Sequence, residues 1–271
     1  MTLRVVALHR YPVKSLGGQA LSQTLIAPRG LAGDRCWMVV TPDGRFLTRR
    51  ELPAMARVAV DWTAQAIVLS QAGHADLIVP VPVDAPPVPV RVWGDSVTAH
   101  DAGDAAADWL SARLGQAVRL VHLPDGVVRP VNAAYGRAGD QVGFADAFPL
   151  LITVVESLDA VNRQLARPIS MARFRPNLVL AGAAAFAEDG WQALLIGAVR
   201  LRVVKPCTRC VITTQDPDSG AVDDPGEPLR TLRAMGRVMP GDARREPVFG
   251  QNAIADGTGT IALGDRVEVS D

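Results

Sequence analysis

The feature that most constrains this chain is a succession of short β-prone segments separated by turn residues. Leu3–Leu8 opens the series, and Cys36–Val40 and Arg45–Thr48 flank Thr41-Pro42-Asp43-Gly44, which is the pattern of a β-hairpin with a tight turn. Further strands of the N-terminal part are expected over residues 58–62, 66–70, 77–81, 88–92, 97–100 and 118–122. This spacing of strands and turns favours a β-rich barrel or sandwich.

Helical patterns are fewer. Asp104–Leu114 and Ser157–Ala166 place their apolar residues at helical spacing, and Ser157 is a candidate N-cap for the second helix. Pro228–Arg233 is expected to form about one helical turn. Strands of the C-terminal half are expected over residues 177–181, 199–204, 211–214, 259–263 and 266–269. The sequence therefore predicts a mixed, β-dominated (α+β) protein with a few helices.

Two segments interrupt this pattern. Pro124–Val142 is polar and rich in turn residues, and a segment of this kind marks either a domain boundary or a functional loop. We expect two domains, an N-terminal β-barrel-like domain over residues 1–120 and a second domain over residues 121–271. Pro80–Pro89 is rich in proline, which cannot donate to a central ladder, so it is expected at a surface connection or a sheet edge.

The composition excludes several classes of function. Lys+Arg and Asp+Glu both total 28, whereas nucleic-acid-binding proteins usually carry a basic excess. We find no secretory leader at the N-terminus and no apolar run near the ~18 residues of a membrane span. Three cysteines are too few for a disulfide-stapled secreted scaffold and suit a reducing compartment. We therefore expect a cytoplasmic protein that binds neither nucleic acid nor membrane.

Lysine is rare in this chain. Of the 28 basic residues only Lys14 and Lys205 are lysines, and GC-rich codon usage accounts for most of that bias. A compact ammonium nonetheless differs from a planar guanidinium as an anion contact.

A Cys-x-x-Cys pair is the sharpest local feature, in Lys205-Pro-Cys-Thr-Arg-Cys-Val-Ile-Thr-Thr214. A zinc site needs about four ligands, but Cys36 is distant and the four histidines show no paired spacing. A thioredoxin-like redox pair would open a helix, whereas Val211–Thr214 favours a strand. Two further interpretations are a pair of incidental thiols and a single thiolate that holds a soft metal or carries sulfur. Spacing alone leaves all four open.

Five motifs in the same order resemble the family of MOSC domain proteins. Cys207–Gly220 and Phe174–Asn177 resemble the two signatures of the MOSC domain, and Phe249–Asn252 matches a further C-terminal pattern. Tyr11–Ser15 and Gly33–Trp37 resemble the MOSC N-terminal β-barrel domain. The resemblance covers essentially the whole chain and implies a MOSC β-barrel domain beside an N-terminal β-barrel-like domain. The relatives it suggests are the mitochondrial amidoxime-reducing components and the bacterial MOSC proteins that reduce N-hydroxylated bases.

The resemblance also implies a cofactor and a site. These relatives carry molybdenum–molybdopterin, and the motif match places the metal ligand on Cys210 rather than Cys207. The cofactor-binding residues that it implies are Lys14, Ser15, Arg35, Asp146, Ala147, Phe148, Arg175, Asn177, Thr208, Arg209 and Asn252. Cationic side chains suit the pterin phosphate, and backbone N–H groups of residues 146–148 suit the pterin edge. Where family members often have an aromatic residue, position 252 is Asn.

Two residues beside these motifs have less specific patterns. Asp216 lies in Asp-Pro-Asp-Ser-Gly, which is typical of a turn, and its functional interpretation is proton delivery near the metal. Cys36 is expected in core packing.

The implied activity is a molybdenum-dependent reductase that acts on small N-hydroxylated substrates such as amidoximes and N-hydroxylated bases. No cysteine follows Cys210, so a fused iron–sulfur domain is not expected, and electrons would come from a separate reductase, ferredoxin or flavoprotein. The alternative is a molybdenum cofactor carrier, or a sulfur carrier with a persulfide on Cys210. No pyridoxal-phosphate-dependent sulfurase domain is expected in this chain.

Overall fold

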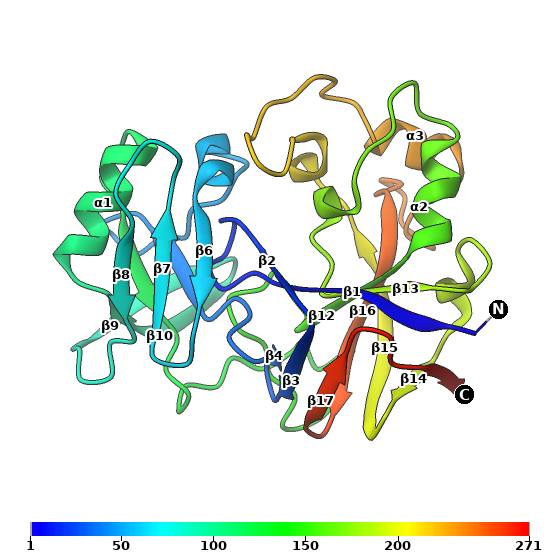
Figure 1. Ribbon diagram of the computed structural model, residues 1–271, viewed down its shortest axis with the longest axis horizontal. Helices are drawn as coiled ribbons and strands as arrows, with labels where there is room; N and C mark the ends of the chain where they lie inside the picture. The colour runs from blue at the N-terminus through cyan, green and yellow to red at the C-terminus, as the bar shows by residue number, and fades with distance from the viewer. Residues whose placement is uncertain (1, 271) are drawn as a thin grey trace.

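The computed structural model describes residues 2–270 and divides them into two bodies that lie side by side (Figure 1). The larger body is built on a mixed sheet in which β12 and β13 are parallel and the remaining neighbours are antiparallel. Its strands, from edge to edge, are β18 (Val267–Ser270), β14 (Ala193–Ile196), β15 (Val199–Thr208), β16 (Val248–Asp256), β12 (Leu150–Val154), β13 (Leu178–Ala181), β1 (Arg4–Arg10) and β2 (Gln19–Leu21).

A small sheet completes the larger body. It consists of β17 (Gly259–Ala262), β3 (Gln23–Ala27) and β4 (Gly30–Leu31). Side chains of both sheets, among them Ile26, Ile152, Leu201 and Ile261, form one apolar cluster with no more than 1% exposure each. Burial of each such side chain contributes roughly 1.5–3 kcal/mol, so this cluster ties the two ends of the chain into one core.

The smaller body contains two sheets and a helix. Its sheets are β5 (Trp37–Val40), β11 (Arg119–His122), β10 (Asp95–Asp101) and β9 (Pro87–Val92), and β6 (Ala59–Trp62), β7 (Ala66–Ser70) and β8 (Leu77–Pro80). Helix α1 (Asp104–Leu114) buries Leu110 and Leu114 against the core that holds Trp37. The proline-rich segment runs between β8 and β9, each of which is an edge strand, as its prolines predicted.

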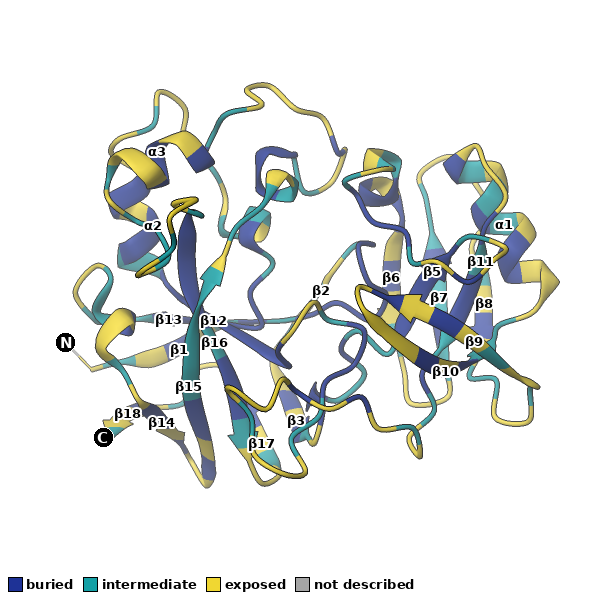
Figure 2. Ribbon diagram, turned by 180° about the vertical axis from the view of Figure 1, so that it is seen from behind, coloured by how far each residue is buried: buried dark blue, intermediate teal, exposed yellow. Residues whose placement is uncertain are grey.

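The remaining helices lie on the larger body. They are α2 (Val155–Asn162), α3 (Leu229–Ala234) and the 3-10 helices η2 (Met171–Phe174), η3 (Ala187–Gly190) and η4 (Val211–Thr214); a fifth short helix, η1 (Pro53–Arg57), belongs to the smaller body. Figure 2 shows that the strands between these elements are buried whereas the outer faces of α1 and α3 are exposed. Within residues 2–270 no helix is long and apolar enough to cross a membrane.

The β-dominated fold class is confirmed, and the sheets add one feature that the sequence analysis did not anticipate. From the first 31 residues, β1 pairs with β13 and β3 with β17, and β2 and β4 add to the sheet edges beside β1 and β3. The chain therefore enters the larger body, leaves it for the smaller one and returns. The division at residue 120 stays a prediction about domains. The consequence for the site is that residues 32–36 and 123–149 connect strands of the two bodies. Together with residues 11–18, between β1 and β2, they form the crossing segments.

Two local predictions are wrong. Residues 211–214 form η4 rather than a strand, because the Thr213 and Thr214 hydroxyls bond the carbonyls of Cys210 and Val211 three residues earlier. Helix α2 begins at Val155, so Ser157 is inside it rather than its N-cap. The Ser157 hydroxyl instead bonds the buried Glu188 carboxyl at 2.8 Å.

Candidate functional site

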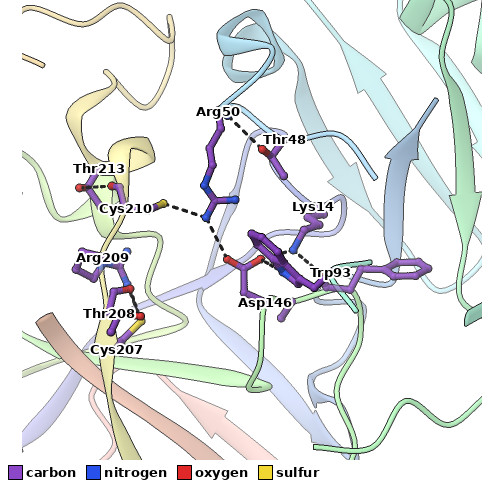
Figure 3. Close-up of polar contacts among 12 residues, drawn as sticks. Lys14, Thr48, Arg50, Trp93, Asp146, Cys207, Thr208, Arg209, Cys210 and Thr213 are labelled. Carbon is purple, nitrogen blue, oxygen red and sulfur yellow. Dashed lines mark hydrogen bonds and ion pairs between the residues drawn. The ribbon is translucent and has the colours of Figure 1, made fainter. Parts of the chain in front are cut away.

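A cavity of about 770 Å³ lies between the two bodies. The larger body contributes the end of β15, the residues before β12, and the residues around η2 and η4. The smaller body and the crossing segments contribute Lys14, Arg50 and Trp93 (Figure 3), and also Arg35. Residues far apart in the chain therefore meet at one place that only the folded arrangement creates.

The wall of this cavity is strongly cationic although the whole chain carries net charge +0. Its lining includes two carboxylates, Asp146 and Glu246. It includes eight basic residues: Lys14, Arg35, Arg50, Arg173, Arg175, Lys205, Arg209 and Arg233. A concave site with so large an excess of one sign of charge concentrates ligands of the opposite sign. The arrangement suits an anionic ligand.

Cys210 lies on this wall at the start of η4. Cys210 is the N-cap residue of that short helix. The Arg50 Nη2 atom lies 3.1 Å from the Cys210 Sγ atom. Arg50 in turn has its backbone N–H bonded to the Thr48 hydroxyl at 3.2 Å. The contact places a positive charge beside the sulfur, and the thiolate is the form of cysteine that binds metals.

Cys207, the other cysteine of the pair, also lines the cavity but has a different partner. Arg209 Nη1 lies 2.9 Å from the Cys207 Sγ atom, and both cysteines are free thiols. Among residues 2–270 no group of three or more His, Cys, Asp or Glu side chains is placed to hold a metal ion, so the zinc interpretation gains no support. The pair precedes a four-residue 3-10 helix rather than a full α-helix, unlike a thioredoxin-like site.

Lys14 and Asp146 form an ion pair in the cavity wall. The Lys14 ammonium is 5% exposed, donates to the Phe144 carbonyl at 2.8 Å and contacts the Asp146 carboxylate. Burial lowers the pKa of Lys14, and the Asp146 charge partly offsets that effect. For Asp146, enclosure opposes ionisation, but the charges of Lys14 and Arg50 outweigh it and hold the pKa of the carboxyl well below its usual range.

Arg35 and Arg175 meet at the ring of Tyr11. Their guanidinium carbons lie 4.4 and 4.1 Å from the ring centroid, and Arg35 Nη2 donates to the Arg175 carbonyl at 3.2 Å. Burial, reinforced by the nearby Arg49 guanidinium, lowers the pKa of Arg175 well below its usual value. A lowered pKa means that keeping the Arg175 guanidinium charged costs free energy, and an anion bound beside that charge offsets the cost.

The two predicted amides differ in how much freedom they retain. Asn177 is 1% exposed, and its Oδ1 atom accepts from Arg35 and from the Leu151 N–H while its Nδ2 atom donates to the His9 carbonyl. Asn177 therefore positions Arg35 rather than offering free donors. Asn252, on β16 opposite Lys205, makes one long bond of 3.4 Å to the Pro206 carbonyl.

The loop before β12 presents unused backbone donors. No hydrogen bond within residues 2–270 uses the N–H groups of Asp146, Ala147 or Phe148. These three residues line the cavity, as do Ser15 and Thr208. Every predicted cofactor-binding residue thus lines the same cavity.

Backbone strain gathers at the same place. In the described part of the chain, six non-glycine residues have positive φ, and four of them, Ser15, Arg35, Trp93 and Arg175, line the cavity. Their φ angles lie between 46° and 68°. Left-handed conformations of non-glycine residues cluster at functional sites because surrounding contacts must hold them.

Asp216 is the predicted catalytic residue that does not line the cavity. Its carboxylate accepts from the Ser219 N–H at 2.8 Å and hydroxyl at 2.7 Å and from the Asp218 N–H at 3.2 Å. These bonds lower its pKa and close a turn. This geometry agrees with the interpretation of Asp216 as a turn residue. It does not place the Asp216 carboxylate where it could deliver a proton to the cavity.

Sequence reasoning missed Arg50, Thr48 and Trp93. Arg50 follows the predicted hairpin strand in a pair of arginines, and nothing in that pair distinguishes it from its neighbour. Arg49 is 2% exposed and donates to the carbonyls of Ser15, Leu16 and Pro217. Trp93 lies in the turn between β9 and β10, where the sequence offered only Trp-Gly.

Two family models match this chain. The MOSC N-terminal beta barrel domain matches residues 2–117, and the MOSC domain matches residues 139–268.

Curated relatives cover nearly the whole chain. Mitochondrial amidoxime-reducing component 1 of Mus musculus is 36% identical over 97% of this chain and 81% of its own length. The Homo sapiens component 1 is 35% identical over 97% and 82%, and the Homo sapiens component 2 is 31% identical over the same shares. This chain therefore belongs to the family of MOSC domain proteins with a MOSC N-terminal β-barrel domain, and it is similar to the mitochondrial amidoxime-reducing components.

Proposed function

We propose that this protein is an oxidoreductase that reduces N-hydroxylated compounds such as amidoximes, with a molybdenum–molybdopterin cofactor in the cationic cavity. The similarity to amidoxime-reducing components over 97% of the chain supports the reductive activity. The single observation that carries the assignment of the site is that one cavity brings the Cys210 thiol together with eight basic side chains.

The residues present fit that cofactor. A pterin phosphate needs cations, and Arg175 has a buried guanidinium nitrogen, Nη2, without a protein acceptor. The polar edge of a pterin needs planar donors and acceptors, and the unused N–H groups of residues 146–148 can supply donors. Cys210 supplies a thiolate, a ligand type suited to soft metal centres. We therefore assign the metal to Cys210, the phosphate to Lys14, Arg35 and Arg175, and the pterin edge to Asp146–Phe148 and Asn252.

The reaction needs an external supply of electrons. An N-hydroxylated compound, two electrons and two protons give the N–H compound and one water. When bound, the cofactor supplies a centre that exchanges two electrons and an oxygen atom with the substrate. The chain's own groups bind and orient: Arg50 donates toward the Cys210 sulfur, and Asn177 fixes Arg35. The sequence holds three cysteines, fewer than the four of a ferredoxin-like cluster, and we expect a separate reductase, ferredoxin or flavoprotein to deliver the electrons.

The test is to express the protein in a host that makes the cofactor and to measure three quantities. These are molybdenum by mass spectrometry, pterin by fluorescence after oxidation, and reduction of benzamidoxime to benzamidine with a reduced viologen as electron donor. Bound molybdenum with turnover supports the proposal.

Bound pterin without turnover would instead favour a cofactor carrier, and a persulfide on Cys210 would favour a sulfur carrier. The exposure of the Cys210 thiol to the cavity is compatible with either role. Absence of molybdenum, of pterin and of a persulfide on Cys210 would contradict all three functions.

A further inference from the structure

Trp93 holds an unusual position in the cavity wall. It is 48% exposed, it lies in the turn between β9 and β10, and its φ is 54°. Residues in such left-handed turn positions are usually Gly, Asn or Asp, because a larger side chain is strained there. The surrounding contacts must therefore hold a large apolar ring in a conformation that disfavours it.

Three contacts fix the indole. Its Nε1 atom donates to the Asp146 Oδ1 atom at 3.2 Å. Its ring lies 4.9 Å from the Phe46 ring, tilted by 55°, and 5.0 Å from the guanidinium carbon of Arg50. The indole N–H is thus bonded to Asp146 (Figure 3) and the plane of the ring is set, while about half of the residue's surface is exposed.

The other aromatic side chains of the lining are covered by protein. Within residues 2–270 these are Phe148, 9% exposed, and Phe174, 0% exposed. Trp93 is consequently the broad apolar surface that a ligand in this charged cavity meets. It also lies near the reactive end, since Arg50 reaches from the indole to the Cys210 sulfur at 3.1 Å.

We propose that Trp93 is a specificity-determining residue, a platform on which planar, aromatic N-hydroxylated amidines stack while their N–OH group faces Cys210. An aryl amidoxime has one conjugated plane, so ring and reacting group lie parallel to the indole together. Aromatic stacking adds to the contribution of buried area alone. Trp93 thereby favours aryl over small aliphatic substrates. This inference rests on the proposed reductase function and names the substrate class of that site.

The experiment compares benzamidoxime with acetamidoxime in the molybdenum-loaded wild type and in Trp93→Phe and Trp93→Leu. Trp93→Leu should lower kcat/KM for benzamidoxime about threefold to tenfold, mainly through KM, and change that for acetamidoxime by about twofold or less. Trp93→Phe should fall between wild type and Trp93→Leu. Trp93→Asn, which tolerates the positive φ, separates loss of the ring from loss of the turn.

A binding measurement gives an answer that does not depend on turnover. Calorimetric titration with benzamidine and acetamidine should show the same selective loss for benzamidine in Trp93→Leu. Trp109→Leu is the matched control, because Trp109 also donates its indole N–H, to the Ala75 carbonyl, and lies 3.7 Å from a guanidinium, yet is remote from the cavity. It should behave as wild type.

Three outcomes would overturn the inference. Equal losses for both substrates, or loss of bound molybdenum in Trp93→Leu, would show that Trp93 only holds Asp146 in place. Kinetic constants of Trp93→Leu that equal those of wild type for both substrates would show that the indole touches no substrate. If wild type reduces neither compound, the proposed function fails, and selective loss of benzamidine binding still decides whether Trp93 is an aryl platform.

Discussion

Arg50 spans the cavity and brings its Nη2 atom to 3.1 Å from the sulfur of Cys210, which belongs to the other body of the protein. The same atom lies 3.7 Å from the Asp146 carboxylate. One guanidinium thus links the thiol on the η4 side to the Lys14–Asp146 pair on the opposite side. The thiol of Cys207 has no such link, because its neighbour is Arg209 of its own segment.

This asymmetry predicts different results for the two cysteines. Cys210→Ser should abolish reduction of benzamidoxime and lower bound molybdenum, because a hydroxyl is a poor ligand for a soft metal centre. Cys207→Ser should be milder and retain most of the metal. Molybdenum content and turnover measured on the same preparations check this prediction. Equal damage from both substitutions would mean that the two sulfurs act as a unit.

The neighbouring arginines predict a contrast in stability. Arg49 donates to three backbone carbonyls and is 2% exposed, whereas Arg50 has a partly exposed side chain. Arg49→Ala leaves three carbonyls without that donor and should lower the free energy of unfolding by about 2–4 kcal/mol. Arg50→Ala should lower it by about 1 kcal/mol or less. Urea denaturation followed by circular dichroism measures the free energy of unfolding of both variants. Similar losses in Arg49→Ala and Arg50→Ala would contradict the view that Arg49 stabilises the fold and Arg50 serves the cavity.

Much of the site, but less of the sheet, was predictable from the sequence. Helix α1 has the predicted bounds because its glycine flanks and apolar spacing are local signals. The central strands β12 and β16 were missed. The first is a continuous apolar run, which does not distinguish strand from helix, and the second contains Gly250, Gln251 and Asn252, which have low strand propensity and are held by pairing with distant residues.

Site residues within motifs were predictable because the motifs carry their chemistry, whereas Arg50 and Trp93 were not. Their roles depend on a hairpin turn and a loop that reach the cavity only after β1–β4 have joined the larger body. The residues next to Arg50 and Trp93 in the sequence carry no information on which distant segments will come close to them in the folded chain.

The phosphate assignment predicts weaker cofactor retention in two variants. Lys14→Ala and Arg175→Ala each remove a cation that lines the cavity, and both should lower the pterin content of the purified protein several-fold. Arg45→Ala, whose side chain pairs with Glu51 on the exterior, is the control and should retain wild-type content. Content that stays unchanged in both cavity variants would mean that the phosphate lies elsewhere.

Glu188 predicts a pH dependence of stability that is separate from the site. Its side chain is fully buried, its Oε2 atom accepts from the Ser157 hydroxyl at 2.8 Å, and its Oε1 atom has no partner. Burial, with a smaller contribution from the Asp189 charge, raises the pKa of Glu188 from 4.5 to about 7. The folded state therefore keeps a proton that the unfolded state loses above pH 4.5. The stability associated with that proton is full below pH 4.5 and is lost as the pH rises through 7.

Glu188→Gln should remove this dependence, because the amide stays neutral and still accepts from Ser157. By the usual conversion of a pKa difference, the variant should gain up to about 3 kcal/mol on wild type between pH 5 and pH 8. Urea denaturation at intervals over that range measures the difference, and Glu268→Gln, on an exposed part of β18, serves as the control. Parallel curves for wild type and Glu188→Gln would mean that the Glu188 carboxyl ionises alike in the folded and unfolded states, which its burial without a cationic partner at Oε1 argues against.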